Sequence, residues 1–275
     1  MFKLPQIITD NLLDNVLDLA LEAGKKVMEI YYTNEFKEKF KQDKSPLTEA
    51  DIASHNTILI GLNQLTPDIP ILSEESVEID YEERKNWQLF WLIDPLDGTK
   101  EFIKRNGEFT INISLIFNGA PILGVVHAPV LGLSYFAMQA GGAFIQREEE
   151  TRVEIKVAQR IEYDKLQIVG SRSHSCERFN NLLSHLGECD YQSMGSSLKF
   201  CLIADGSAHL YPRLGPTMEW DTAAAQCIVT EAGGMVCDEH GQALLYNKPN
   251  LLNASFVVIS ATDEFLLRKV MACKW

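Results

Sequence analysis

Residues 91–99, WLIDPLDGT, join an apolar run to a short stretch of acidic and small residues. The run at residues 89–93 has the length and composition of an apolar strand. It ends at Asp94, and Asp97 follows in a stretch whose proline and glycine are typical of a turn. The sequence therefore predicts a strand that delivers two carboxylates to its end.

Further acidic residues stand beside apolar segments elsewhere in the chain. Glu74 follows the apolar run at residues 69–72, and Asp221 opens the alanine-rich helix predicted at residues 221–232. Carboxylates at strand ends and at a helix start can converge on one edge of a sheet. They would repel one another and raise each other's pKa unless a cation lay among them, and ligands that are all oxygen favour magnesium.

Each of these acids also has a purely structural interpretation. Asp94 and Asp97 stand where turns commonly form, and Asp221 could cap a helix. Asp51 stands three residues after Thr48, which is the spacing of a capping box. Taken singly, each acid favours the structural interpretation, whereas the whole set favours a metal site.

The remaining chain reads as a run of strands followed by strands mixed with helices. Apolar alternation and turn residues predict strands at residues 69–72, 89–93, 110–117, 122–127, 133–138, 143–146, 166–169, 209–211 and 256–260. Helical periodicity predicts helices at residues 11–31, 177–186, 197–204, 221–232 and 263–271, with a further helix entered near residues 45–48. This order favours an α/β or α+β fold, with an antiparallel meander in the first half. The weakest boundary lies near residues 148–165. It divides the chain into an α+β half at 1–160, which carries most of the candidate metal ligands, and an α/β half at 161–275, which carries Asp221 and the candidate substrate contacts.

Composition excludes several classes of function. The chain has 275 residues, 46% of them hydrophobic, and a formal net charge of −13, so disorder and binding to nucleic-acid polymers are both disfavoured. A small anionic substrate is still compatible with this negative charge if bound metal or a few basic side chains contact it in the site. The chain shows no signal peptide and no transmembrane run, and its six cysteines form no C-x-x-C pair. We therefore expect a cytoplasmic protein with reduced thiols.

Other catalytic motifs are missing from the sequence. The six histidines show no zinc-binding spacing, and the chain has no Walker loop, no G-x-G-x-x-G and no G-x-S-x-G. Zinc hydrolase, nucleotide-binding loop and serine hydrolase chemistry are therefore poor fits.

The residues gathered above resemble a family signature. Residues 91–99 are similar to the first motif of the inositol monophosphatase superfamily, and 219–225, EWDTAAA, are similar to its second motif. The segment 73–76, SEES, lies where that family places a metal-binding glutamate. The longer segments 94–113 and 195–213 resemble the bacterial 3'(2'),5'-bisphosphate nucleotidases of the CysQ type. The resemblance covers nearly the whole chain.

This resemblance implies a fold and an activity. The fold would be a layered α-β-α-β-α sandwich. The activity would be hydrolysis of 3'-phosphoadenosine 5'-phosphate (PAP) to AMP and phosphate, linked to sulfate assimilation, with two or more Mg²⁺ ions and sensitivity to lithium. The resemblance leaves three points open: action on the phosphosulfate PAPS, a monomer or a homodimer, and peripheral contact with the inner membrane.

The resemblance also assigns roles to single residues. The implied metal ligands are Glu74, Asp94, the main-chain carbonyl of Leu96, Asp97 and Asp221. The implied catalytic residues are Glu74 and the pair Asp51 and Thr99, which would orient the attacking water. The implied contacts to the reacting phosphate are the amides of Gly98 and Thr99 and the helix start after Asp221.

A second phosphate and a nucleoside need contacts of their own. Candidates are Ser196, Lys199 and Arg213 for the second phosphate, with His174 near the base or ribose. Their alternatives are ordinary surface charges for Lys199 and Arg213, and a helix cap for Ser196. An arginine can grip a phosphate through two parallel hydrogen bonds.

Two rival functions remain at this point. An inositol monophosphatase or a broad sugar phosphatase would share the fold and the metal site, but would not need a second anion site around Lys199 and Arg213. A regulator that binds phosphorylated metabolites without turnover is a rival of another class. The intact set of acids with Thr99 disfavours it.

Overall fold

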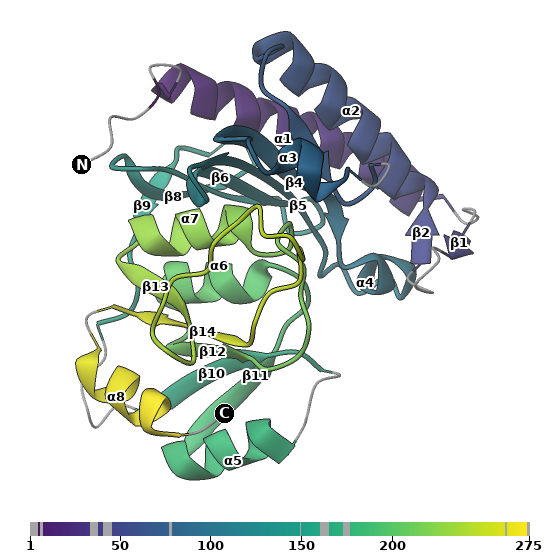
Figure 1. Ribbon diagram of the computed structural model, residues 1–275. Coiled ribbons are helices and arrows are strands. Elements are labelled where there is room, and N and C mark those ends of the chain that lie inside the picture. The colour runs from purple at the N-terminus through teal and green to yellow at the C-terminus, as the bar shows by residue number, and fades with distance from the viewer. Residues whose placement is uncertain are drawn as a thin grey trace.

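Five layers of helices and sheets build the molecule. The computed structural model describes residue 5 and residues 8–33, 38–40, 46–76, 79–148, 150–159, 165–172, 177–261 and 263–273. Helices α1 (Asp10–Tyr31) and α2 (Glu49–Leu65) form one outer layer, and α5 (Glu177–Leu186) and α8 (Glu264–Ala272) form the other (Figure 1). Helices α6 (Leu198–Ala204) and α7 (Ala223–Glu231) lie between two sheets. The expected α-β-α-β-α sandwich is therefore confirmed.

The first sheet contains seven strands in chain order. They are β3 (Ile71–Ser73), β4 (Leu89–Asp97), β5 (Thr110–Phe117), β6 (Ala120–Ala128), β7 (Leu133–Met138), β8 (Gly142–Arg147) and β9 (Val153–Ile155). Strands β3 and β4 are parallel, and every later pair is antiparallel. The predicted meander is therefore correct. The carboxyl ends of β3 and β4 meet at one edge, which brings Glu74 beside the acids of β4.

The second sheet contains five strands in the order β11-β10-β12-β14-β13. Their bounds are β10 (Leu166–Gly170), β11 (Cys189–Ser193), β12 (Leu210–Arg213), β13 (Gly234–Asp238) and β14 (Phe256–Ser260). The short elements β1 (Glu38–Phe40), β2 (Pro46–Thr48), α3 (Tyr81–Arg84) and α4 (Thr99–Ile103) complete the described fold.

Helix α7 packs closely on the first sheet because small residues face each other. A Cβ added at Gly124 in β6 would lie 2.2 Å from the carbonyl oxygen of Ala224, so the sheet and the helix backbone are nearly in contact. The alanines at 223–225 are buried in an apolar cluster that draws residues from both sheets. This packing fixes the segment that precedes α7, which carries Asp221.

Several predicted boundaries shift in the structure, and two shifts bear on the site. Strand β4 continues past residue 93 to Asp97, where Asp94 pairs with Asn112 and Asp97 pairs with Thr110. Between these two pairs, β4 advances by three residues while β5 advances by two, which makes a β-bulge. A bulge tolerates a proline such as Pro95 inside a strand. Helix α7 begins at Ala223 rather than at Asp221. Asp221 is therefore not its first residue.

The structure also contains elements that the sequence patterns did not reveal. Strands β9, β11 and β13 and the short elements β1, β2, α3 and α4 were not expected. In the part of the chain that the structure describes, no helix is both long enough and apolar enough to cross a bilayer. The described cysteines are free thiols, and Cys176 lies outside the described residues; they are Cys189, Cys201, Cys227, Cys237 and Cys273.

Candidate metal centre and substrate cavity

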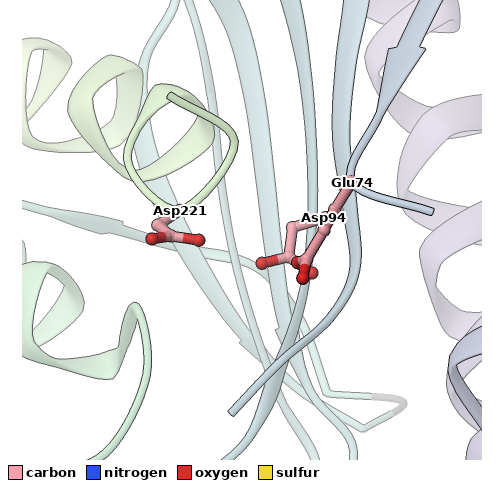
Figure 2. A group of neighbouring side chains, drawn as sticks. All are labelled: Glu74, Asp94 and Asp221. Atoms are coloured by element: carbon pink, nitrogen blue, oxygen red, sulfur yellow. The ribbon is translucent and has the colours of Figure 1, made fainter. Parts of the chain in front are cut away.

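Three carboxylates from separate segments converge at the edge of the first sheet. Glu74 follows β3, Asp94 lies in β4, and Asp221 lies just before α7. One oxygen of each lies within 4.8 Å of the others, and Figure 2 shows the three side chains directed toward a common point. The sequence predicted that acids at strand ends and at a helix start would converge, and the three acids do meet, although Asp221 lies just before α7 rather than at its start.

Asp94 carries the clearest sign that the cluster suits a cation. Its side chain is 1% exposed, and Oδ1 accepts a hydrogen bond from the Leu96 amide at 3.1 Å. Among the described residues, its Oδ2 has no hydrogen-bond partner, which is costly for a buried carboxylate oxygen. Burial, followed by the charge of Glu74, raises the pKa of Asp94 well above its usual range. A divalent ion bound by oxygen ligands would relieve both penalties.

Asp221 is held from two sides. Its Oδ2 accepts a hydrogen bond from the Met218 amide at 2.9 Å, and its main-chain carbonyl accepts one from the Ser197 hydroxyl at 2.8 Å. Burial raises the pKa of Asp221 to about 8, and the charges of Asp97 and Glu74 add to that rise. A cation bound among these acids would favour their charged forms.

A buried glutamate with a partly exposed lysine partner supports the segment that leads to Asp221. Glu219 is fully buried, and its carboxylate contacts the Lys248 ammonium at 2.7 Å. The same carboxylate accepts hydrogen bonds from the amides of Asn247 and Lys248 at 2.6 and 3.0 Å. These contacts fix the loop, because loss of Lys248 would leave the buried carboxylate of Glu219 without its charged partner.

Asp97 and Leu96 lie at the same edge but outside the closest group of three. Both line the cavity described below, together with Glu74, Asp94 and Asp221. The Asp97 carboxylate accepts a hydrogen bond from the Ser197 hydroxyl at 2.9 Å. Both residues are therefore placed to join the proposed ligand set, and the role of each stays a prediction.

Asp51 forms the capping box of α2 and also contacts Thr99, and its catalytic role stays a prediction. Its Oδ2 accepts hydrogen bonds from the Thr48 amide and hydroxyl at 2.7 and 2.6 Å, which completes the capping box of α2. Its Oδ1 accepts a hydrogen bond from the Thr99 hydroxyl at 3.2 Å. Burial raises the pKa of Asp51, and its bonds to Thr48 oppose that rise. The helix cap thus holds the carboxylate that orients Thr99.

The Gly98 turn brings Thr99 to the cavity. Gly98 has φ of +97°, and a Cβ there would lie 3.2 Å from the Glu108 carbonyl oxygen. A residue with a side chain would be strained in this conformation. Helix α4 begins directly afterwards at Thr99, and both residues line the cavity.

A cavity of about 450 Å³ joins the acids to a basic region. Its lining includes Lys199 from α6, Tyr211 and Arg213 from β12, and Ser196 between β11 and α6. The candidate metal ligands and the candidate second anion site therefore share one cavity. The volume is in the range typical of small-molecule sites.

Lys199 is a buried cation held by main-chain carbonyls. It is 5% exposed, and its ammonium donates hydrogen bonds to the carbonyls of Met194 and Ser196 at 3.3 and 2.5 Å. It also lies 5.4 Å from the centre of the Tyr211 ring. Burial lowers the pKa of Lys199 to about 8. The interpretation of Lys199 as an ordinary surface charge is therefore wrong.

Arg213 is partly exposed and folds back on its own loop. Its Nε donates a hydrogen bond to the Gly215 carbonyl at 3.2 Å, and Nη2 donates one to the Pro216 carbonyl at 2.7 Å. These bonds orient the guanidinium at the cavity wall without neutralising its charge. A ligand phosphate would meet that positive charge there.

A carboxylate clamp shapes the loop that carries Ser196. Glu108 forms a paired contact with the Arg172 guanidinium, and it accepts a hydrogen bond from the Gly195 amide at 2.7 Å. Ser196 has φ of +46°, and Ser197, rather than Ser196, occupies the N-cap position of α6. The interpretation of Ser196 as a helix cap is therefore wrong. His174 lies outside the described residues.

Sequence reasoning missed the polar residues that connect these groups. Thr110, Asn112 and Ser114 alternate along β5, and all three are buried. Asn112 donates a hydrogen bond to the Ser197 hydroxyl at 2.9 Å. The alternation of polar and apolar residues at 110–115, TINISL, was the signal that could have revealed a buried polar face.

Known proteins resemble this chain over nearly its full length. The model of the inositol monophosphatase family matches residues 10–274. The chain is 49% identical over 249 residues to the "3'(2'),5'-bisphosphate nucleotidase CysQ" of Salmonella typhimurium, covering 90% of this chain and 99% of that protein. The protein of the same name from Escherichia coli K12 has the same identity and coverage.

A solved structure shows the same likeness in three dimensions. It is the crystal structure of CysQ from Bacteroides thetaiotaomicron, described as a bacterial member of the inositol monophosphatase family. The TM-score is 0.81 at 39% identity, covering 94% of this chain and all of that one. Motifs, fold, acid cluster and relatives agree, and the chain belongs to the inositol monophosphatase family.

Proposed function

We propose that this chain is a 3'(2'),5'-bisphosphate nucleotidase that removes the 3'-phosphate of PAP, giving AMP and phosphate. The observation that carries the proposal is a single cavity with an acid cluster in one part of its lining and Lys199 and Arg213 in another. The relatives named as bisphosphate nucleotidases, 49% identical over most of the chain, support the substrate.

Magnesium is the ion that the acid cluster suits best. Glu74, Asp94 and Asp221 would hold it, with Asp97 and the Leu96 carbonyl completing the ligand set for two or more ions. Bound Mg²⁺ would neutralise phosphate charge and lower the pKa of a water molecule. The buried, unpartnered oxygen of Asp94 is the structural support for this assignment.

The protein's own groups would position the reactants. The Thr99 hydroxyl donates to Asp51, so its lone pairs are free to accept a hydrogen bond from the attacking water and align it. The amides at Gly98 and Thr99, at the start of α4, would contact oxygens of the reacting phosphate. Positioning and charge do most of the work in such a reaction.

A second phosphate would account for the basic part of the cavity. The chain carries a net charge of −13, so a buried lysine and an arginine in one cavity mark a local exception. A bound phosphate would favour the protonated form of Lys199. An inositol or sugar monophosphate has no second phosphate that would need Lys199 and Arg213. The retained set of acids together with Thr99 disfavours a regulator that binds without turnover.

The position of the bond that breaks gives a direct test. Incubation of PAP with the enzyme and Mg²⁺ should release one phosphate, and chromatography should identify the remaining nucleotide as AMP with its phosphate at the 5' position. Formation of adenosine 3'-phosphate would overturn the proposed orientation. PAPS in the same assay would show whether the phosphosulfate is also accepted.

A further inference from the structure

A chain of buried polar side chains runs from the basic part of the cavity to the acid cluster. Ser196 contacts Thr110 at 2.9 Å, Thr110 donates to Asn112 at 3.0 Å, and Asn112 donates to Ser197 at 2.9 Å. Ser197 then lies 2.9 Å from the Asp97 carboxylate and 2.8 Å from the Asp221 carbonyl. The side chains of Thr110, Asn112 and Ser197 are each at most 1% exposed.

The direction of these hydrogen bonds follows from the acids at one end. A carboxylate and a carbonyl can only accept, so Ser197 must donate its proton to one of them. Ser197 then accepts from the Asn112 amide nitrogen, which turns the amide oxygen toward Thr110. Thr110 donates to that oxygen, and Ser196 therefore donates to Thr110. Every member of the chain has one consistent orientation.

Ser197 occupies a helix start without serving as its cap. It stands at the N-cap position of α6, where serine usually bonds a backbone amide, but its side chain makes no such bond. Its hydroxyl instead lies between the Asp97 carboxylate, at the end of β4, and the main-chain carbonyl of Asp221, which precedes α7. Asn112 lies directly opposite Asp94 in the pairing of β4 with β5.

We propose that Asn112 and Ser197 are positioning residues that set the separation of Asp97 and Asp221 and so determine how tightly the site binds a divalent ion. The inference rests on the metal site of the proposed function. Partners that orient metal ligands commonly change metal affinity by about 10- to 100-fold when removed. Because Ser197 reaches Asp97 only as long as Asn112 orients its hydroxyl, the two residues should act as one unit.

The test measures binding of Mn²⁺ to the metal-free chain by calorimetry, with no substrate present. Ser197→Ala and Asn112→Leu should each weaken binding by about 10- to 100-fold. The double variant should be no weaker than the weaker single variant, because residues in one network are not additive. Activity at saturating Mg²⁺ should recover toward that of the unmodified enzyme, while the Mg²⁺ concentration for half-maximal activity rises.

Ser114→Ala is the matched control. Ser114 is a fully buried serine on the same strand, and its hydroxyl donates to the Leu123 carbonyl at 2.9 Å. This variant loses a buried hydrogen bond of the same kind but touches no acid of the cluster, so its Mn²⁺ binding should stay within about threefold of the unmodified chain. If Asn112→Leu does not fold, Thr110→Val, which removes the donor to Asn112 with little change of shape, takes its place.

The outcomes separate this inference from the proposed function. If the unmodified chain binds Mn²⁺ and Ser197→Ala binds it equally well, the positioning role is wrong and the metal site stands. If Ser114→Ala weakens binding as much as Ser197→Ala does, the effect comes from general loss of packing, and the positioning role is also wrong. If the unmodified chain binds no divalent ion, the metal site of the proposed function fails first.

Discussion

The acid cluster and the basic part of the cavity are built in different ways. The acids come from a strand end, a strand interior and a segment that the buried Glu219 and its Lys248 partner support, and one buried oxygen of Asp94 has no partner among the described residues. The basic side chains instead bind main-chain carbonyls, Lys199 those of Met194 and Ser196, and Arg213 those of Gly215 and Pro216.

This difference separates two kinds of preorganisation. The acid cluster is electrostatically strained without a cation, since burial and mutual repulsion raise the pKa values of Asp94 and Asp221. The basic groups are satisfied by hydrogen bonds and still carry charge toward a ligand. We therefore expect variants of the acids to affect turnover of every substrate, and variants of the basic groups to affect only substrates with a second phosphate.

Asp94→Asn should have the largest effect on activity. Loss of the negative charge on a central metal ligand should lower kcat by more than about 100-fold, because even outer partners of metal ligands can cost that much. Circular dichroism should show an unchanged fold. Asp68→Asn, which removes the charge of an exposed aspartate, is the control and should keep full activity. Substantial turnover by Asp94→Asn with ordinary Mg²⁺ affinity would contradict the ligand assignment.

Thr99→Val should lower kcat by about 100-fold, with the metal affinity unchanged, because the water would lose its orienting partner. Thr99→Ser keeps the hydroxyl and should retain much of the activity. Thr57→Val, which removes a hydroxyl bonded to the Ala53 carbonyl in α2, is the matched control. Equal kcat for Thr99→Val and the unmodified enzyme would remove Thr99 from the reaction.

Arg213→Ala should separate two nucleotides that differ by one phosphate. We expect kcat/KM for PAP to fall by about 10- to 100-fold, the loss typical of a charged hydrogen bond, and kcat/KM for adenosine 3'-phosphate to change by less than about threefold. Arg268→Ala, at an exposed arginine of α8, is the control. Equal losses on both substrates would give Arg213 a structural role and would leave the second anion site without support.

The stability of the metal-free chain should depend on pH in a direction opposite to ordinary acid denaturation. The pKa of Asp221 is raised from 3.8 to about 8, so this carboxyl binds more protons in the folded than in the unfolded chain. Stability is therefore lost as pH rises through that window, and the melting temperature should fall by about 2–4 °C or more between about pH 5 and pH 8. Saturating Mg²⁺ should abolish the fall.

Two variants and one contradicting outcome test this pH dependence. Asp94→Asn should flatten the dependence, because it removes a second carboxyl whose pKa burial raises well above its usual range, whereas Asp68→Asn should leave it unchanged. A metal-free chain that becomes more stable toward pH 8 would mean that the acids of the cluster are not destabilising.

The acid side of the site could be predicted from sequence because its residues lie in contiguous motifs at element ends. The apolar part of β4 and the alanine-rich helix α7 follow from local pattern, although β4 extends to Asp97 and α7 begins only at Ala223. The connecting residues could not be predicted in this way. Asn112 and Ser197 are 85 residues apart in the sequence, and they form a hydrogen bond only because the fold brings β5 and the start of α6 together. The short strands β9, β11 and β13 also carried too little pattern to be seen.

Other expectations stay predictions. The division into halves at 1–160 and 161–275 is one of them. Helix α7 packs on both sheets, and one apolar cluster draws residues from both, so the two halves share a core. The roles of single site residues, the number of ions, lithium sensitivity, and the choice between monomer and homodimer are others. His174 has no described position in the structure.

Phosphate release from PAP and from inositol 1-phosphate, measured side by side with and without Mg²⁺, separates a bisphosphate nucleotidase from an inositol monophosphatase. We predict rapid release from PAP that requires Mg²⁺ and little release from the inositol ester. Preference for the inositol ester would keep the fold and the acid cluster but contradict the second anion site around Lys199 and Arg213.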